Sequence, residues 1–183
     1  MNKGNYAEFG VTQKIEGKYK RNMFLCIALY VGLAAAVLLT SFLVGGGGPF
    51  VIVIATACLF VIIPVLRTFT WDKYVKVDHK YVIDSAKIKF TDTHGKKETV
   101  MFEKLVSSFS LIAPVTEEYK DKYTNADVTM DFRGTVKSPN SYFLLDEEGG
   151  KKTVIFFEAT QQAVKVMSFY NSKNTVKSDT LTV

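Results

Sequence analysis

The stretch NMFLCIALYVGLAAAVLLTSFLVGGGGPFVIVIATACLFVIIPVL, from Asn22 to Leu66, decides the organisation of the chain. It contains no Lys, Arg, Asp or Glu, although 23 basic and 18 acidic residues occupy the rest of the 183-residue sequence. A soluble domain of this size cannot bury so long an uncharged stretch, and a disordered chain would not contain it. The stretch therefore predicts a membrane anchor, and the residues after it are numerous enough for one compact domain.

Two apolar helices joined by a short turn account for the stretch. The run 23–44 would be roughly 33 Å long as a helix, which matches the hydrocarbon core of a bilayer. The run 50–69 includes Arg67, whose long side chain can reach the lipid headgroups. The glycines and the proline at 45–49 predict the turn between them. A cleaved signal peptide is the alternative for the first run, but that run is longer than such segments usually are.

Basic residues flank both ends of the apolar stretch, whereas the turn has none. Because positive charge is retained on the cytoplasmic side, we predict a two-span protein of the cell membrane with both termini in the cytoplasm. The flanking residues either set this topology alone or also contact anionic headgroups, each for roughly 1 kcal/mol. The candidate membrane-surface contacts are Lys18, Lys20, Arg21, Arg67, Trp71 and Lys73.

Four small side chains recur at every fourth position of the first helix, namely Ala28, Gly32, Ala36 and Thr40. On a helix they form one strip, along which another backbone can approach closely. The strip would pack against the second helix or against a second copy of the chain, and the latter predicts a homo-oligomer. Both cysteines also lie in the apolar stretch, so no disulfide is expected in the aqueous part.

After the apolar stretch the hydrophobic period changes to two, which is typical of β-strands. Residues 86–90 show this alternation most clearly, and the acidic and glycine residues 146–150 predict the turn of a β-hairpin. The pattern predicts about seven short strands. They are expected at 74–77, 86–90, 99–102, 109–115, 128–132, 142–145 and 153–157.

One amphipathic helix is expected at the end of the domain, over residues 159–170. Thr160 is its predicted N-cap, and Ala163, Val164 and Met167 would face the sheet. About seven antiparallel strands closed by a C-terminal helix describe a pleckstrin-homology-like (PH-like) barrel, although a β-sandwich with a terminal helix has a similar order. The predicted organisation is a basic cytoplasmic segment (1–21), two transmembrane helices (22–70), a cytoplasmic PH-like domain (71–172) and a flexible tail (173–183).

Three sequence phrases in this region resemble an uncharacterised family of small membrane proteins from Gram-positive, largely anaerobic bacteria. They are Ile112–Val115 (IAPV), Ser138–Phe143 (SPNSYF) and Val154–Glu158 (VIFFE). Members of that family have two N-terminal membrane helices followed by a β-rich region. The resemblance therefore implies this architecture from Met23 to Tyr170, but it implies no chemistry, because the phrases carry no known activity.

The sequence lacks the residue patterns of catalytic and metal sites. No pair of histidines or cysteines has metal-ligand spacing, and the serines at 107, 108 and 110 lie in no nucleophile motif. The acidic residues 146–148 lie at a predicted hairpin tip, where charges are usually solvated. We therefore expect no enzymatic activity, no cofactor and no metal. After the apolar stretch, basic and acidic residues are interspersed, which argues against a nucleic-acid partner.

Two functions of different kinds agree with these features, and both have the lipid bilayer as a partner. In the first, the protein is a membrane-anchored, non-enzymatic adaptor. Its PH-like domain would bind a protein partner at the inner membrane face through a sheet edge or groove. In the second, the domain senses anionic lipid headgroups. The lysines that would do so are Lys73, Lys76, Lys87 and Lys89.

Overall fold

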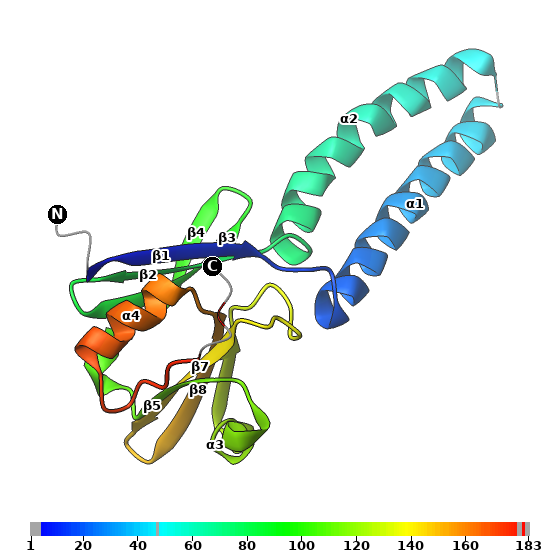
Figure 1. The fold of residues 1–183 in the computed structure, drawn as a ribbon. Coiled ribbons are helices and arrows are strands. Elements are labelled where there is room, and N and C mark those ends of the chain that lie inside the picture. Colours follow the sequence, from blue (N-terminus) through cyan, green and yellow to red (C-terminus); the bar gives the residue numbers. More distant parts are fainter. Residues whose placement is uncertain (1–4, 47, 179–180, 182–183) are drawn as a thin grey trace. The chain divides into compact units, whose positions relative to one another are not determined.

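The computed structural model describes residues 5–46, 48–178 and 181 (Figure 1). These residues form two compact units. The helical unit comprises residues 14–77, and the β-rich unit combines the residues up to Gln13 with those from Asp78 onward. The helices are therefore inserted into the sequence of the β-rich unit instead of preceding it.

Two helices make up the helical unit, as the apolar runs predict. α1 covers Gly17–Gly45 and α2 covers Pro49–Tyr74. Gly46 has a φ of 63°, a left-handed conformation that glycine adopts without steric cost, and it ends α1. Both helices are longer than predicted because the polar residues beside each apolar run continue the helix. Gly47, in the predicted turn, lies outside the described residues.

One face of each helix packs against the other. At the end away from the turn, the hydroxyl oxygens of Tyr30 and Thr70 lie 2.5 Å apart. The Asn22 side chain donates a hydrogen bond to the carbonyl oxygen of Tyr74 at 3.0 Å. In a bilayer such interhelical bonds satisfy polar groups that lipid cannot. The buried residues of the helical pair are Cys26, Ala55 and Leu59.

Most apolar side chains of the helical unit remain exposed. The exposed fraction is 56% for Phe24, 89% for Val44 and 78% for Phe60. Such exposure is unfavourable in water by about 25 cal/mol per Å² of apolar surface, and lipid removes this cost. Both helices are long and apolar enough to cross a membrane. They are the two membrane-span candidates of the described chain.

The first sheet of the β-rich unit has four antiparallel strands in the order β1-β2-β3-β4. β1 precedes the helical unit in sequence and β2 follows it, yet the two strands pair directly, with Thr12 opposite Asp78. The Thr12 hydroxyl also donates to the Asp78 carboxylate at 2.6 Å. The strands are β1 (Ala7–Thr12), β2 (Asp78–Asp84), β3 (Lys87–His94) and β4 (Lys97–Leu105).

β1 corrects the predicted division of the chain. Residues 1–21 were predicted to form a separate basic segment, whereas residues 7–12 are an edge strand of the sheet. Ala7 is buried and Phe9 packs against the core, while Glu8 and Gly10 are exposed. This period-two pattern is short and contains Gly10, so it was not recognised as a strand.

The second sheet has the order β5-β7-β8-β6. β7 pairs antiparallel with β5 and with β8, whereas β6 runs parallel to β8. The turn between β7 and β8 lies at Gly149 and Gly150, both with positive φ, as predicted for a hairpin. The strands are β5 (Leu111–Pro114), β6 (Val128–Asp131), β7 (Ser141–Glu148) and β8 (Lys151–Glu158).

The two sheets do not close into the predicted barrel. β4 ends at Leu105, and the 3₁₀ turn Val106–Ser108 leads the chain out of the first sheet, so β5 pairs with β7 and not with β4. The strand predicted at 74–77 was also wrong, because α2 continues to Tyr74 and the strand begins at Asp78. Among the described residues, eight strands in two sheets replace the predicted seven-stranded barrel.

One hydrophobic core joins both sheets to α4 (Gln161–Tyr170). The Thr160 hydroxyl accepts a hydrogen bond from the backbone N–H of Ala163 at 3.1 Å, which confirms the predicted N-cap. The helix residues predicted to face the sheet are buried. Fully buried members of this core include Ile83, Ile88, Phe90, Leu144, Ile155, Phe157 and Met167.

The second sheet is buried on both faces. Phe143 lies in a separate apolar cluster on the face opposite the main core, where Tyr119 and Tyr123 pack against it. Tyr123 belongs to α3 (Lys120–Thr124), the short helix over this face. Burial on both faces explains why residues 142–145 form a continuous apolar run without alternation.

Of the predicted flexible tail (173–183), the described residues 173–178 pack against the second sheet, while residues 179, 180, 182 and 183 lie outside the described part of the chain. The backbone N–H of Ile112 donates to the carbonyl of Asn174 at 2.7 Å, and the N–H of Val176 donates to the carbonyl of Ile112 at 2.8 Å. This segment therefore covers the outer edge of β5. The polar composition of this segment does not predict these bonds, because they join backbone atoms only.

Candidate membrane-interface site

The residues predicted to contact the membrane surface lie at the end of the helical unit away from the turn. The hydrogen bond from Asn22 to Tyr74 joins the start of α1 to the end of α2 at this place. The two basic flanks are therefore neighbours within the helical unit. Lys18, Lys20, Arg21, Arg67 and Lys73 are exposed, and Trp71 is half-buried.

Helix stability does not explain the charges at the start of α1. The N-terminus of a helix disfavours each basic residue by about 0.3–1 kcal/mol. The first turn of α1 nevertheless contains Lys18 and Lys20 and no acidic residue. Lys73 is placed differently, since it lies in the last turn of α2 with its Nζ 4.9 Å from the centre of the Tyr74 ring. The presence of Lys18 and Lys20 at this position therefore requires an explanation other than helix stability.

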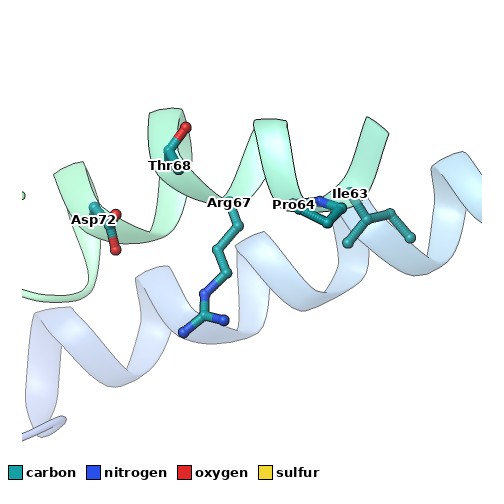
Figure 2. A pocket seen from close by; sticks show the side chains of 5 residues that line it. All are labelled: Ile63, Pro64, Arg67, Thr68 and Asp72. Carbon is teal, nitrogen blue, oxygen red and sulfur yellow. The ribbon is translucent and has the colours of Figure 1, made fainter. Parts of the chain in front are cut away.

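A groove of about 390 Å³ lies on α2 next to these residues (Figure 2). It is lined by the apolar side chains of Ile63 and Pro64 and by the polar side chains of Arg67, Thr68 and Asp72. The groove thus combines an apolar floor with one cation and one anion.

Local features of α2 form this groove. Pro64 has no backbone N–H, so the helix lacks one internal hydrogen bond there. The Thr68 hydroxyl donates to the carbonyl of Val65 at 2.7 Å and is therefore turned back to its own helix. Arg67 and Asp72, in contrast, make no ion pair or hydrogen bond with any residue that the structure describes. They are the two charged groups that the groove offers to a ligand.

Arg67 was predicted at the interface, whereas Asp72 was not. An acidic residue within a basic interfacial flank is unusual under the positive-inside pattern, and this is the signal that would have found it. The helix was also expected to end near residue 69, which placed Asp72 in the predicted PH-like domain (71–172). Because α2 continues to Tyr74, Asp72 is held on the same helix as Arg67.

The arrangement of elements, a β-rich unit with a C-terminal helix and an inserted apolar hairpin, corresponds to one known family. A family model described as "Bacterial PH-like domain (DUF6106)" matches residues 3–177. The chain belongs to this family. The match includes both units, so the family resemblance predicted from sequence is confirmed, and the β-rich unit is the PH-like domain. The comparisons with curated proteins and with solved structures gave no match.

The strip of small residues on α1 does not face α2. Ala28, Gly32, Ala36 and Thr40 are all exposed, and a Cβ built on Gly32 would have nothing within 4 Å. The sequence left two packing partners open for this strip, the second helix and a second copy of the chain. In the structure the strip does not pack against the second helix, α2. Contact with a second copy of the chain stays a prediction.

In the PH-like domain, the acidic residues of the β7 end form an ion-pair cluster with β4. The Lys104 ammonium lies 2.8 Å from the Asp146 carboxylate and 2.6 Å from that of Glu148. The hydrogen bonds that the Lys104 ammonium donates to both carboxylates raise the pKa of Lys104, and the same ammonium lowers the pKa of Glu148. Asp146 is buried, contrary to the solvated hairpin tip expected from sequence, and the cluster ties the two sheets together.

A second polar cluster holds the N-terminal strand. His79 is buried in β2, with Nδ1 at 2.7 Å from Asp92 Oδ1 and Nε2 at 3.1 Å from Gln13 Oε1. Phe132 packs edge-on against the imidazole ring. These contacts fasten the chain just before α1 to β2 and β3. Across the described residues, no group of three or more His, Cys, Asp or Glu side chains is placed to hold a metal ion.

Proposed function

We propose that the protein is a non-enzymatic, membrane-anchored adaptor that presents its PH-like domain at the inner face of the cell membrane. The family assignment supplies the PH-like domain, and the two apolar helices supply the anchor. The cytoplasmic location rests on the basic residues at both ends of the helical unit, because such residues are retained on that side. In this proposal both termini are cytoplasmic.

The pairing of β1 with β2 carries this proposal. Thr12 and Asp78 are 66 positions apart in sequence, and both membrane-span candidates lie between them. Two strands cannot form a ladder across a bilayer, so their pairing supports a chain that leaves and re-enters the β-rich unit on one side of the membrane. The same pairing anchors the domain through two chain segments, which restricts its movement more than a single tether would.

The partner surface that we propose is the outer edge of β4. β4 is the last strand of its sheet, and no described strand pairs with its outer side. Val100 and Met101 on this strand are each 48% exposed. An extended peptide can add to such an edge through backbone hydrogen bonds, with specificity from alternate side chains. The other end of the same sheet is less open, because β1 contacts α4.

Headgroup sensing by the domain lysines is the alternative function. Lys87 lies 3.4 Å from Glu103, so part of its charge is already compensated within the domain. Lys89 is half-buried between its neighbours in β3. These two observations favour the adaptor over the headgroup sensor.

Site-specific photo-crosslinking in intact cells tests the adaptor proposal. A photoreactive residue at Met101 should yield one protein adduct, whereas the same residue at Lys151, on the exposed β7–β8 turn, should not. Replacing Val100 with Asp should weaken the Met101 adduct. Equal labelling at both positions, or salt-sensitive binding of the domain to anionic vesicles without a protein adduct, would favour the headgroup sensor.

A further inference from the structure

The groove on α2 contains two opposite charges that do not neutralise each other. Arg67 is exposed and Asp72 is half-buried, and both line the groove. Figure 2 shows that the Arg67 side chain extends away from α2 and not along it toward Asp72. Desolvated or interfacial charges are normally paired, so two unpaired opposite charges in one groove indicate a ligand with both charges.

The order of these charges along α2 matches the order of charges in a lipid headgroup. The two residues are five positions apart, which corresponds to about 7.5 Å along a helix. Arg67 is next to the apolar run, and Asp72 is nearer the end of α2 at Tyr74. In a glycerophospholipid with an amine headgroup, the phosphate is next to the glycerol, and the amine is further from the acyl chains. The cation therefore lies at the depth of the phosphate and the anion at the depth of the amine.

We propose that this groove binds the headgroup of phosphatidylethanolamine. The Arg67 guanidinium donates to the phosphate oxygens, the Asp72 carboxylate accepts from the primary ammonium, and Ile63 and Pro64 contact the glycerol and the first acyl carbons. Charge-assisted hydrogen bonds of this kind are about twice as strong as neutral ones. The proposal goes beyond the adaptor function and rests only on the membrane location of α2.

Charge complementarity separates this headgroup from those of phosphatidylglycerol and phosphatidylcholine. Phosphatidylglycerol has a phosphate but no cation, so Asp72 would repel it. Phosphatidylcholine has both charges, but its quaternary ammonium has no N–H to donate to a carboxylate. A phosphate with a primary ammonium is the headgroup that satisfies both Arg67 and Asp72.

The test measures which lipid the full-length protein retains. The protein is reconstituted in nanodiscs with equal amounts of phosphatidylethanolamine, phosphatidylcholine and phosphatidylglycerol, and is then released for native mass spectrometry. We expect phosphatidylethanolamine to be retained over each competitor by about tenfold, the effect of one charge-assisted hydrogen bond. Equal retention of the three lipids, or enrichment of phosphatidylglycerol, would overturn the proposal.

Variants separate the two charges. Asp72→Asn should remove the preference for phosphatidylethanolamine over phosphatidylcholine while leaving phospholipid bound. Arg67→Gln should reduce retention of all three lipids, and Arg67→Lys should restore part of it. Lys96→Gln is the control, because it removes an exposed cation of the β3–β4 turn, outside the helical unit and its groove. Unchanged preference in Asp72→Asn would contradict the assignment of the ammonium.

Two further arms complete the test. O-phosphoethanolamine, the free headgroup, is added at millimolar concentration to each sample. No displacement is expected, and complete displacement would show that the groove binds a soluble phosphate compound instead of a lipid. Carbonate washing of membranes with each variant checks the location, since a protein that stays in the pellet but shows no lipid preference sinks this inference and leaves the adaptor proposal intact.

Discussion

Phe60 in α2 and Phe169 in α4 are similarly exposed, at 78% and 69%, but they belong to regions with opposite organisation. Phe60 is one of many exposed apolar residues in the helical unit, whereas Phe169 is an exception beside the buried face of an amphipathic helix. The PH-like domain buries its apolar side chains internally, whereas the helical unit leaves most of its own exposed, as two membrane-span candidates would. Exposure alone therefore does not distinguish a surface residue from a membrane residue, but the exposure of its neighbours does.

The largest expected effect is a cavity in the PH-like domain. Phe157 is fully buried and its ring contacts those of Tyr81 and Phe90. We expect Phe157→Ala to lower the free energy of unfolding of the domain by about 3–5 kcal/mol. Urea unfolding of the full-length protein in detergent micelles, followed by far-UV circular dichroism, measures this. If the loss were below 1 kcal/mol, the main core would be less packed than described.

Replacing each of the two exposed phenylalanines, Phe60 and Phe169, with Arg tests the difference between the regions directly. Phe60→Arg should disfavour membrane insertion by about 2.5–3.5 kcal/mol, because it places a cation in hydrocarbon. Phe169→Arg should change stability by less than about 0.5 kcal/mol, because that side chain already faces water. The fraction of each variant in the membrane pellet is the readout. Equal behaviour of the two variants would remove the distinction.

A smaller effect is expected where β1 touches the rest of the PH-like domain. A Cβ at Gly134 would lie 2.4 Å from the Val11 side chain and 3.0 Å from the Thr12 carbonyl oxygen. We expect Gly134→Ala to cost about 1–3 kcal/mol by overpacking, and Val11→Ala to recover part of this loss in the double variant. Hydrogen exchange of the β1 amides would locate the effect. A neutral Gly134→Ala would mean that β1 is held loosely.

The smallest effect concerns the ion-pair cluster between the sheets. Lys104→Met should cost about 1 kcal/mol near neutral pH. The pKa of Lys104 is raised above 10.5, so its contribution is present below pH 10.5 and is lost as the pH rises through the raised value. The pKa of Glu148 is lowered below 4.5, so its contribution is present above pH 4.5 and is lost as the pH falls through the lowered value.

The difference in unfolding free energy between wild type and Lys104→Met should therefore be constant between about pH 5 and pH 10 and should decrease outside this window. Urea titrations at about pH 3, pH 7 and pH 11 measure it. Glu103→Gln is a suitable control, because Glu103 is exposed and pairs only weakly with Lys87 at 3.4 Å. A difference that increases toward pH 3 would contradict the geometry.

Periodic patterns explain which parts of the fold were predictable. The uncharged run gave both helices, and the spacing of Ala163, Val164 and Met167 gave α4 with its cap at Thr160. These features depend on local sequence alone. The barrel was not predictable in the same way, because strand pairing is decided by non-local contacts. The 3₁₀ turn after β4, which separates the two sheets, has no strong sequence signal.

The role of the N-terminal segment and the composition of the groove could not be predicted from local sequence. β1 becomes visible only through its pairing with β2, which the intervening helices conceal in the sequence. Arg67 was predicted at the interface from its charge and position. Asp72 joined it only when α2 was found to extend five residues beyond its predicted end at residue 69. In both cases the structure places an element boundary at a different residue from the one that composition predicted.

Replacing residues 14–77 with Asn-Gly tests the central claim most directly. The substitution joins β1 to β2 through the three-residue loop Gln13-Asn-Gly, a length that suits antiparallel strands. We predict that this variant is soluble, folds with the circular dichroism of the PH-like domain and leaves the membrane fraction, while the full-length chain resists carbonate extraction. Release of the full-length chain by carbonate, or retention of the shortened variant in the membrane, would contradict the account.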